Sequence, residues 1–576
     1  MARITSPHRL GLFILLFALL SCTRDRMTVT GAERLYGKNK IHDTNYQWKE
    51  IQGDGYRVIY PEQLRKRALD VATIYGYHLG RISQDLDLPI DKNIPVFVYP
   101  SQKEYETTNI VTGLVRGSGG FTEFFKERVA FPVSSNDKRL QQLALHEITH
   151  AVQLEYLLAG PYRSLQLLLT GVLSPLWFME GVAQYESNGW DSTPAMYVRD
   201  AVMDHKLIPL NQLRGFSHLP PHQIYLAYYQ SDLFIQFLVD TYGQDTVPRL
   251  LRLIKNKLNL HSAIHQVTGK DAYHLEWAWR EYADSRLRVG GEGWQDPFEE
   301  VRLLTANKGW NLFPTYSPDG SKIAFLSDWE NETFEFSLYL LERSTGRLTR
   351  LQERYLSPAP LGWSHDGTRL VFVSDEDNRN DLFLYDITRE ESEPIKQNLR
   401  VNSFPAFLPG DVEVGFVGTV DGFADIYKIN LENGKLTPLT QTSNDEAYPH
   451  WSADGNLLVF SREYQRQFDL ILKDLLSGKE TRLTNTPQDE IWPLLMPEGK
   501  TILFVSDEAG IFNLHLLELE NGATHPLSKV IGGIFSPRIS PDGKRLLFSY
   551  FRHGQYKIFE SIRLPWKPGG TNGTWP

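Results

Sequence analysis

The sequence has a single cysteine, Cys22, so no disulfide can form within the chain. It also lacks an uninterrupted apolar segment long enough to cross a bilayer, because its longest apolar core, residues 10–20, is only eleven residues long. An excess of basic residues is missing as well, since 60 Lys and Arg against 70 Asp and Glu give a formal net charge of −10. We therefore expect no nucleic-acid partner, because nucleic-acid-binding proteins carry clustered basic residues and a high pI.

The apolar core near the first residue is typical of a secretory signal. Arg3 and Arg9 flank the short basic region before residues 10–20, which have the length of a signal-peptide core. Residues 19–22, Leu-Leu-Ser-Cys, resemble the lipobox of bacterial lipoproteins, in which the cysteine is acylated and becomes the mature N-terminus. The resemblance implies a signal peptide at residues 1–21, a lipid on Cys22 and a tether at residues 22–45.

A lipid on Cys22 predicts an exported protein that is anchored in the cell envelope. Loss of residues 1–21 removes two arginines and no acidic residue, so the net charge changes from −10 to −12. Thr23 follows the cysteine where an aspartate would indicate retention at the inner membrane, and by analogy with enterobacterial sorting this favours the outer membrane, on its periplasmic face. The alternative is an ordinary cleaved signal in which the cysteine is coincidental.

The pattern His-Glu-x-x-His runs from His146 to His150 within an apolar segment. If this segment is helical, the two histidines lie on one face with Cβ atoms roughly 5–6 Å apart, and both imidazoles can bind one zinc ion. Glu147 then lies beside the metal, where a carboxylate can take a proton from water and give it to a leaving amine. The alternative is two surface histidines on an ordinary helix, although the pattern is expected by chance only about 0.05 times in such a chain.

A catalytic zinc site needs three protein ligands and one open position. The metzincin spacing would require glycine and histidine at two positions where this sequence has Gln153 and Tyr156. The remaining acidic candidates are Glu155, Glu180 and Glu186. Glu155 lies five residues after His150, off the ligand face of the expected helix.

Residues 177–183 form a Trp-x-x-Glu-Gly-x-Ala pattern after the HExxH motif. The combination resembles the gluzincin peptidases, the MA-like clan of thermolysin and the zinc aminopeptidases. The resemblance implies that His146, His150 and Glu180 hold a zinc ion and that Glu147 is the general base. The spacing departs from the aminopeptidases, because 29 residues separate His150 from Glu180. The alternative role of Glu180 is a first-turn carboxylate that is stabilised by the helix dipole.

The same resemblance implies two further parts of a site. Residues 128–133 read as a strand, which in gluzincins forms the edge of the cleft and pairs with the substrate backbone. Pro132 argues modestly against an internal strand that is paired on both sides. Related enzymes use Tyr or His to stabilise the oxyanion, and this implies Tyr228 or Tyr229, although either ring could simply pack on its helix.

Other apolar periodicities predict the surrounding elements. We expect strands at 56–60 and 94–99, helices at 62–86, 224–242, 247–255 and 276–288, and a capping box from Ser101 to Glu104 at the start of another helix. Residues 157–176 are rich in leucine, which favours a place in the core, but a lid over the cleft or a contact with lipid remains open.

The sequence after residue 301 is repetitive. Six tight turns, mostly Asp-Gly, fall at positions 320, 367, 411, 455, 499 and 543, with steps of 47, 44, 44, 44 and 44 residues. In the third repeat the order is Gly-Asp, so that turn is expected to differ. An apolar strand follows each turn, and this arrangement resembles the TolB-type β-propeller with six four-stranded blades. The sixth repeat lacks its outer strand, and residues 302–305 are expected to supply it and close the ring.

The sequence therefore predicts a multidomain chain in which an α+β gluzincin-like metallopeptidase domain is followed by an all-β six-bladed propeller. The expected parts are a signal peptide (1–21), a tether (22–45), the peptidase-like domain (46–295), the propeller (296–566) and a flexible tail (567–576). The expected function is zinc-dependent hydrolysis of peptide or protein substrates in the cell envelope, with the propeller as a platform for a substrate or an envelope partner. The alternative is a protein-binding lipoprotein whose peptidase domain is latent or inactive.

Overall fold

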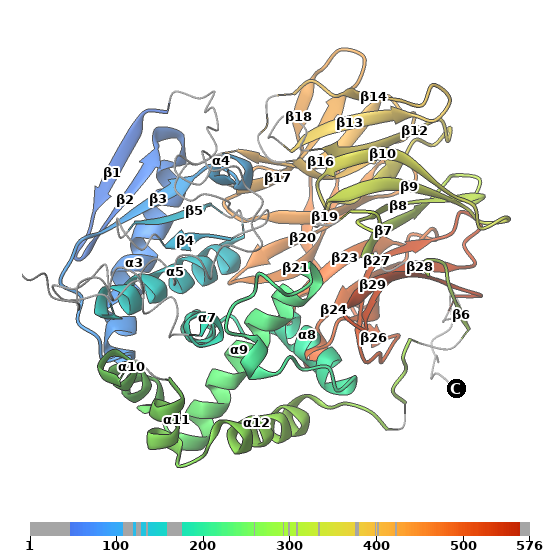
Figure 1. Ribbon diagram of the computed structural model, residues 1–576. Helices are drawn as coiled ribbons and strands as arrows, with labels where there is room; N and C mark the ends of the chain where they lie inside the picture. The colour runs from blue at the N-terminus through green and yellow to red at the C-terminus, as the bar shows by residue number, and fades with distance from the viewer. Residues whose placement is uncertain are drawn as a thin grey trace, which may run out of the picture.

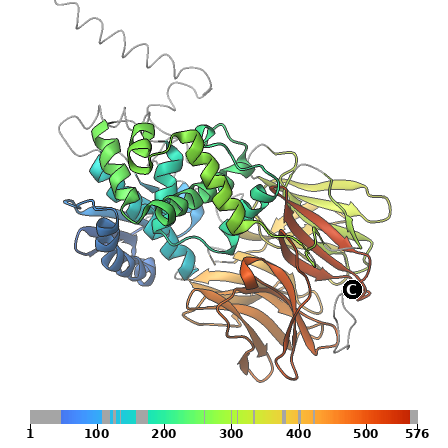
Figure 2. The ribbon, with the colours of Figure 1, turned by 90° about the horizontal axis from the view of Figure 1, so that it is seen from below.

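The computed structural model describes residues 46–564 except 107–118, 123–127, 134–135, 158–174, 258–259, 292, 298–299, 307–308, 332–334, 375–379, 398, 400–401 and 421–422. The predicted signal peptide, Cys22, the tether, the tail and most of the leucine-rich segment 157–176 lie outside these residues. The described residues form a helix-rich domain and a ring of β-sheets (Figure 1, Figure 2). Among them, no helix combines the length and the apolar character that a membrane span requires.

The first domain contains a five-stranded sheet with the order β1-β2-β3-β5-β4. Its strands are β1 (Trp48–Gln52), β2 (Tyr56–Pro61), β3 (Ile94–Tyr99), β4 (Phe121–Thr122) and β5 (Val129–Pro132). Strands β2, β3 and β5 are parallel, whereas β1 and β4 run antiparallel at the two edges. Alternate side chains such as Val58, Val96 and Val98 are fully buried, so this face of the sheet belongs to the core.

The strand expected at the edge of the cleft is internal. The predicted strand at residues 128–133 is confirmed as β5, but β5 pairs with β3 on one side and with β4 on the other, so its predicted place at the edge is wrong. Among the described residues the edge strand is β4, which pairs with Val129 and Ala130 of β5. Pro132 therefore lies beyond the end of this pairing, where its missing N–H leaves no gap in the ladder.

Helices cover the sheet and extend the domain. They are α3 (Arg65–Asp85), α4 (Gln102–Glu106), α5 (Asp137–Leu157), α7 (Leu176–Glu186), α8 (Ser192–Met203), α9 (Pro221–Tyr242), α10 (Thr246–Lys257), α11 (Leu260–Thr268) and α12 (Ala272–Leu287). Four of the predicted helices are confirmed within a few residues, and a short 3₁₀ turn, Glu62–Leu64, leads into α3. The capping box is also confirmed, because the Glu104 N–H donates to the Ser101 hydroxyl at 3.2 Å.

The second domain is a six-bladed propeller, as predicted. Blades one and two contain β7 (Asn311–Tyr316), β8 (Lys322–Ser327), β9 (Phe336–Glu342), β10 (Leu348–Leu356), then β11 (Gly362–Trp363), β12 (Arg369–Ser374), β13 (Asp381–Asp386) and β14 (Glu391–Pro394). Blades three and four contain β15 (Asn402–Phe407), β16 (Glu413–Val420), β17 (Phe423–Asn430), β18 (Leu436–Pro438), then β19 (Glu446–Trp451), β20 (Leu457–Tyr464), β21 (Gln467–Asp474) and β22 (Glu480–Arg482). Blades five and six contain β23 (Glu490–Leu495), β24 (Thr501–Ser506), β25 (Asn513–Glu518), β26 (Thr524–Pro526), then β27 (Gly533–Ile539), β28 (Leu546–Arg552) and β29 (Gln555–Ser561).

Strand β6 (Val301–Leu303) completes the sixth blade by pairing antiparallel with β29. The ring is thus closed by a strand from its own N-terminal end, which confirms the expected closure and leaves β29 no free edge. All six predicted turn positions have a positive φ. Five are glycines, while in the third repeat Asp411 adopts a φ of 57° directly after Gly410.

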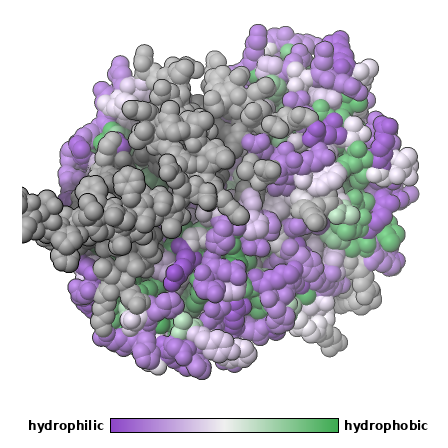
Figure 3. Space-filling view, viewed as in Figure 1, coloured by the Kyte–Doolittle hydropathy of each residue, from purple (hydrophilic) through white to green (hydrophobic). Residues whose placement is uncertain are grey.

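The two domains share a buried interface. The ring of Tyr197 on α8 lies 4.6 Å from that of Phe551, and both side chains are buried in or beside the core of the propeller. Arg199, 3% exposed, donates to the carbonyl oxygens of Gly510 and Ile531. These contacts fix α8 against blades five and six. The coloured residues in Figure 3 are mainly hydrophilic, in keeping with the burial of most large apolar side chains among the described residues.

The N-terminus of α5 also rests on the propeller. Backbone N–H groups of Asp137 and Lys138 donate to the Glu463 carboxylate at 3.0 and 3.2 Å. A carboxylate at this position satisfies free N–H groups and interacts favourably with the helix dipole. The buried Arg67 of α3 lies 3.7 Å from Asp445 of the propeller and also pairs with Asp137. The propeller therefore supports the helix that carries the HExxH motif.

The interface predicts that substitution of Arg552 lowers the stability of the protein strongly. Its guanidinium pairs with Asp200 at 2.6 Å, Asp204 at 2.8 Å and Asp296 at 2.9 Å, with 10% of the side chain exposed. Arg552→Met removes the cation that lies between the buried Asp200 and Asp204, so we expect the free energy of unfolding in urea to fall by about 3 kcal/mol. The control is Arg389→Met, which removes a side chain that is 77% exposed and should change stability little. Equal stability of the two variants would contradict the interface.

Candidate metal centre

Helix α5 carries both histidines of the HExxH motif on one face. Its opposite face is held in the core by residues such as Leu145, Ile148 and Val152, which are all buried. This packing turns His146 and His150 toward α7, and their Nε2 atoms lie 3.1 Å apart. The expected side-by-side placement of the two imidazoles is thus present.

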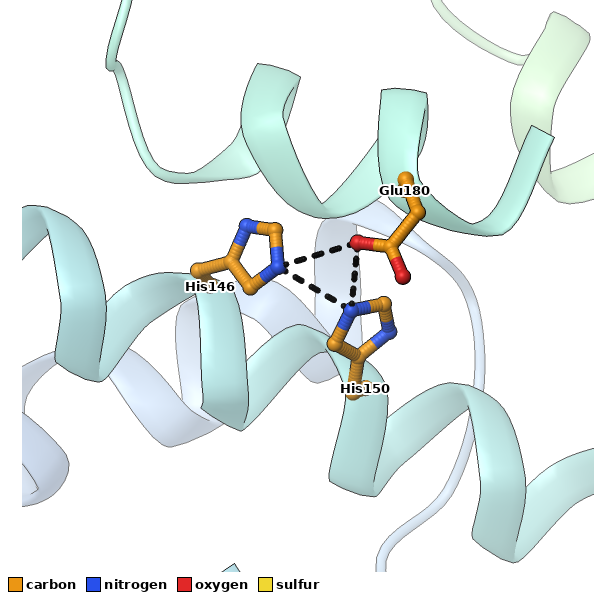
Figure 4. Close-up of side chains that lie close together, drawn as sticks. All are labelled: His146, His150 and Glu180. Carbon is orange, nitrogen blue, oxygen red and sulfur yellow. Dashed lines mark hydrogen bonds and ion pairs between the residues drawn. The ribbon is translucent and has the colours of Figure 1, made fainter. Parts of the chain in front are cut away.

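Glu180 completes a three-residue cluster from the neighbouring helix α7 (Figure 4). Its Oε2 atom lies 3.2 Å from Nε2 of His146 and 3.2 Å from Nε2 of His150. In the part of the chain that the structure describes, this is the one group of three or more metal-ligating side chains whose ligand atoms all lie within 4.8 Å of one another.

The cluster fits a zinc ion. Ligands bound tetrahedrally at about 2.0–2.1 Å lie roughly 3.3 Å apart, close to the separations seen here. Two imidazole nitrogens and a carboxylate oxygen also form a known catalytic donor set, which leaves a fourth position for water or substrate. The three side chains are 13–14% exposed, so that position can be reached from solvent.

Gly181 explains how Glu180 reaches the histidines. A Cβ atom at this position would lie 2.7 Å from the backbone oxygen of Ser231 on α9. Only glycine therefore allows α7 to approach α9 this closely. Trp177 and Phe178 are buried on the same helix and hold α7 against the core. The Glu-Gly pair of the motif thus combines a ligand with the residue that positions its helix.

Two glutamines orient the histidines. Nδ1 of His146 lies 3.2 Å from Oε1 of Gln184, and Nδ1 of His150 lies 3.1 Å from Oε1 of Gln153. An amide oxygen accepts a hydrogen bond, so each Nδ1 carries a proton and each Nε2 is the ring nitrogen that a metal would bind. The sequence prediction missed this role. Its signals are the helical spacings, because Gln184 lies four residues after Glu180 and Gln153 three residues after His150.

Glu147 lies beside the cluster and is 3% exposed. The Thr122 hydroxyl of the edge strand β4 donates to its Oε2 at 2.6 Å. A Cβ atom on Gly120 would lie 2.5 Å from its Oε1, so glycine lets the chain before β4 pass this carboxylate. Burial raises the pKa of Glu147, against the lowering effects of the two histidines and Thr122. A raised pKa suits a group that must accept and then release a proton.

Mutual electrostatic interactions hold the cluster together. Burial alone would raise the pKa of Glu180, but His150 and His146 outweigh it and lower that pKa well below the usual range. Burial alone would lower the pKa of His150, but the Glu180 carboxylate raises it to about 9, so a metal at Nε2 would displace a proton from this ring. The carboxylate is therefore ionised across the physiological range, as a metal ligand must be.

The structure separates the two candidate tyrosines. The ring of Tyr228 lies 6.5 Å from that of His146, and the charge of Glu180 is the largest cause that raises the pKa of its hydroxyl. Tyr229 instead packs against Tyr197 and Tyr225 at the domain interface. Only Tyr228 therefore lies at the cluster.

The other acidic candidates lie elsewhere. Glu155 accepts a hydrogen bond from the backbone N–H of Asp91 at the surface. Glu186 is buried and pairs with Arg81 at 3.1 Å, and burial raises its pKa to about 7. Neither belongs to the three-residue cluster, which leaves Glu180 as the third ligand candidate.

The glutamine contacts predict an effect on metal affinity. Gln184→Leu removes the acceptor for His146 Nδ1, and we expect the zinc dissociation constant to rise 10–100-fold, as is typical when a ligand loses its orienting partner. Competition with a chromogenic chelator measures this constant. Gln141→Leu is the control, because Gln141 lies on α5, the helix of both histidines, and contacts His78, away from the cluster. Equal affinities in the two variants would contradict the orienting role.

Comparison with known proteins gives relatives of limited extent. The chain is 27% identical over 144 residues to an uncharacterised protein of Agrobacterium fabrum, covering 25% of this chain and 48% of that protein. It is 24% identical over 224 residues to a TolB homologue of Protochlamydia amoebophila, covering 35% of this chain and 47% of that protein. It is 28% identical over 151 residues to the uncharacterised peptidase YuxL of Bacillus subtilis, covering 26% of this chain and 21% of that protein. The chain thus spans half or less of the length of these relatives.

Two family models match the two domains. Residues 79–285, which include the whole cluster, match the peptidase MA superfamily. Residues 295–516 match the TolB β-propeller domain, and the six blades of the structure agree with that match. The predicted fold class is therefore confirmed, and the chain joins a domain of the peptidase MA superfamily to a TolB-type β-propeller.

Proposed function

We propose that this protein is a zinc-dependent peptidase of the bacterial cell envelope. The main support is the convergence of His146, His150 and Glu180 from two helices, with the buried Glu147 beside them. A zinc ion on these ligands would supply a Lewis acid and lower the pKa of water at its open position. The membership of residues 79–285 in the peptidase MA superfamily agrees with this chemistry.

Glu147 is the proposed general base and acid. Thr122 donates to its Oε2, which leaves Oε1 to take a proton from the attacking water. The same carboxylate then gives the proton to the amine that leaves. Its burial near the cluster limits competing solvent and strengthens the interactions of its charge.

Tyr228 and the edge strand β4 are the proposed substrate contacts. A phenol hydroxyl near the cluster can donate a hydrogen bond to the developing oxyanion of the substrate. The outer side of β4 is where an extended peptide could add as a further strand. Because Thr122 of β4 contacts Glu147, a peptide bond on this edge would lie next to the general base.

This proposal predicts that Glu147→Gln abolishes peptide cleavage. We expect kcat to fall by at least about 10³-fold, because the amide cannot accept the proton, whereas zinc affinity should stay within a few fold. A peptide library and a form beginning at Thr23 measure cleavage without the expected lipid anchor. Glu155→Gln is the control, since Glu155 lies on the same helix but away from the cluster.

Two outcomes would contradict the mechanism. Equal cleavage by the wild type and Glu147→Gln would remove Glu147 from its role. Absence of cleavage by every form would favour the alternative, a binding lipoprotein with a latent peptidase domain.

We also propose that a lipid on Cys22 anchors the protein in the outer membrane, facing the periplasm, and that the propeller binds a substrate or an envelope partner. The support for the anchor is the signal core followed by Leu-Leu-Ser-Cys. Cys22 is the one thiol of the chain, so acylation can be followed without interference from other cysteines.

The anchor predicts the behaviour of Cys22→Ala. In a bacterial host the wild type should incorporate labelled palmitate and sediment with membranes, whereas the variant should incorporate none and lose most of its membrane association. Ser21→Ala is a control that alters the neighbouring position and keeps the thiol. Equal labelling of the wild type and Cys22→Ala would contradict lipidation at this residue.

A further inference from the structure

The inner strands of the six blades surround the axis of the propeller. In each strand, the residue five positions before the turn is followed by an apolar side chain that packs in or against a core cluster of the propeller, so it lies on the side of the axis. These axial residues are Thr315, Gly362, Ala406, His450, Leu494 and Arg538. Half of them are small or hydroxyl-bearing, and Arg538 is the one charged member.

Aromatic side chains close the axis on the side that faces the peptidase domain. They stand two residues earlier in four of the six strands, at Phe313, Phe404, Tyr448 and Trp492, each with a positive φ. The rings of Phe313 and Trp492 lie 5.8 Å apart although their blades are not neighbours, so this contact crosses the axis. Trp492 also lies 4.7 Å from the ring of Tyr448. Arg538 and His450 thus lie on the side of this layer that faces the turns.

Arg538 has no carboxylate partner among the described residues. Its one hydrogen bond is from Nη1 to the carbonyl oxygen of the adjacent Pro537, at 2.9 Å. Burial lowers the pKa of its guanidinium to about 10, and no acidic group in the described part of the chain counteracts this effect. Arg462 of blade four, by contrast, pairs with Glu446 and Glu480 at 2.8 Å each. A partly buried charge without a partner is costly, so an uncompensated arginine favours a counter-charge from outside the chain.

His450 supplies a second donor at the same level of the axis as Arg538. Its Nδ1 accepts a hydrogen bond from the backbone N–H of Leu495 at 3.2 Å, so the proton of the neutral ring is on Nε2. Burial lowers the pKa of His450 to about 3, with a further contribution from Arg538, and the ring is neutral at physiological pH. The pair therefore offers N–H donors and one positive charge.

We propose that the turn-facing side of the propeller axis binds a carboxylate between Arg538 and His450. A planar guanidinium matches a carboxylate with two parallel hydrogen bonds, and the imidazole N–H adds a third. The carboxylate can belong to a free small acid or to the C-terminus of a peptide chain. The aromatic layer blocks passage along the axis, so this ligand is held on the propeller and is not passed through the ring to the metal centre.

Isothermal titration calorimetry of the full-length protein tests the site with three probes at constant ionic strength: N-acetyl-diglycine, its C-terminal amide, and acetate. We expect the acid to bind at least about tenfold more tightly than the amide, because a charge-assisted pair is lost in the amide. If acetate binds as tightly as N-acetyl-diglycine, the ligand is a free small acid. If acetate binds more weakly, the ligand is the C-terminus of a peptide. Equal binding of the acid and the amide would overturn the proposal.

Arg538→Gln separates a binding role from a structural one. We expect carboxylate binding to weaken at least about tenfold, while the midpoint of thermal unfolding without ligand rises by about 1 °C or more, because an unpaired charge is removed. Arg389→Gln, the control, removes the same charge from an exposed site and should change neither. Carboxylate binding that persists in Arg538→Gln, or a lower unfolding midpoint in that variant, would overturn the proposal. Neither readout depends on peptide cleavage, so failure of the proposed peptidase activity is distinguishable.

Discussion

The close contact between α7 and α9 at Gly181 is the constraint on which the metal centre depends. Because the Ser231 backbone leaves no room for a Cβ atom there, α7 lies deep enough for Glu180 to meet His146 and His150. The motif is thus more than a set of ligands. It pairs a carboxylate with the residue that allows its helix to approach, and Gly120 plays the same part for the strand that passes Glu147.

Features set by local spacing could be predicted from the sequence. Two histidines four residues apart on a helix share a face whatever surrounds them, so the placement of His146 and His150 follows from helix geometry. The propeller could be predicted equally well, because each turn position needs a positive φ and the turns repeat at a nearly constant interval. The prediction of Glu180 as a ligand needed the longer Trp-x-x-Glu-Gly-x-Ala pattern. Its distance from the histidines in the sequence does not show that it lies near them in space.

Features that depend on tertiary packing were not predictable in the same way. Gln184 and Thr122 are ordinary polar residues in the sequence, and only the meeting of α7, β4 and α5 gives them partners. Strand β4 has two residues, too few for any periodicity, and so the edge of the sheet was assigned to β5. The choice of Tyr228 over Tyr229 depends on which side of α9 faces the cluster and which faces the propeller.

Closure of the ring by β6 gives the chain an order of assembly. Strand β6 leaves the ribosome before all six inner strands, yet its partner β29 is synthesised last. Arg552, which holds α8, also belongs to that final blade. The helical domain can therefore complete its own core early. Its surface at α8 stays exposed until the last blade has been synthesised. A chain truncated before that blade would leave both the ring and this surface open.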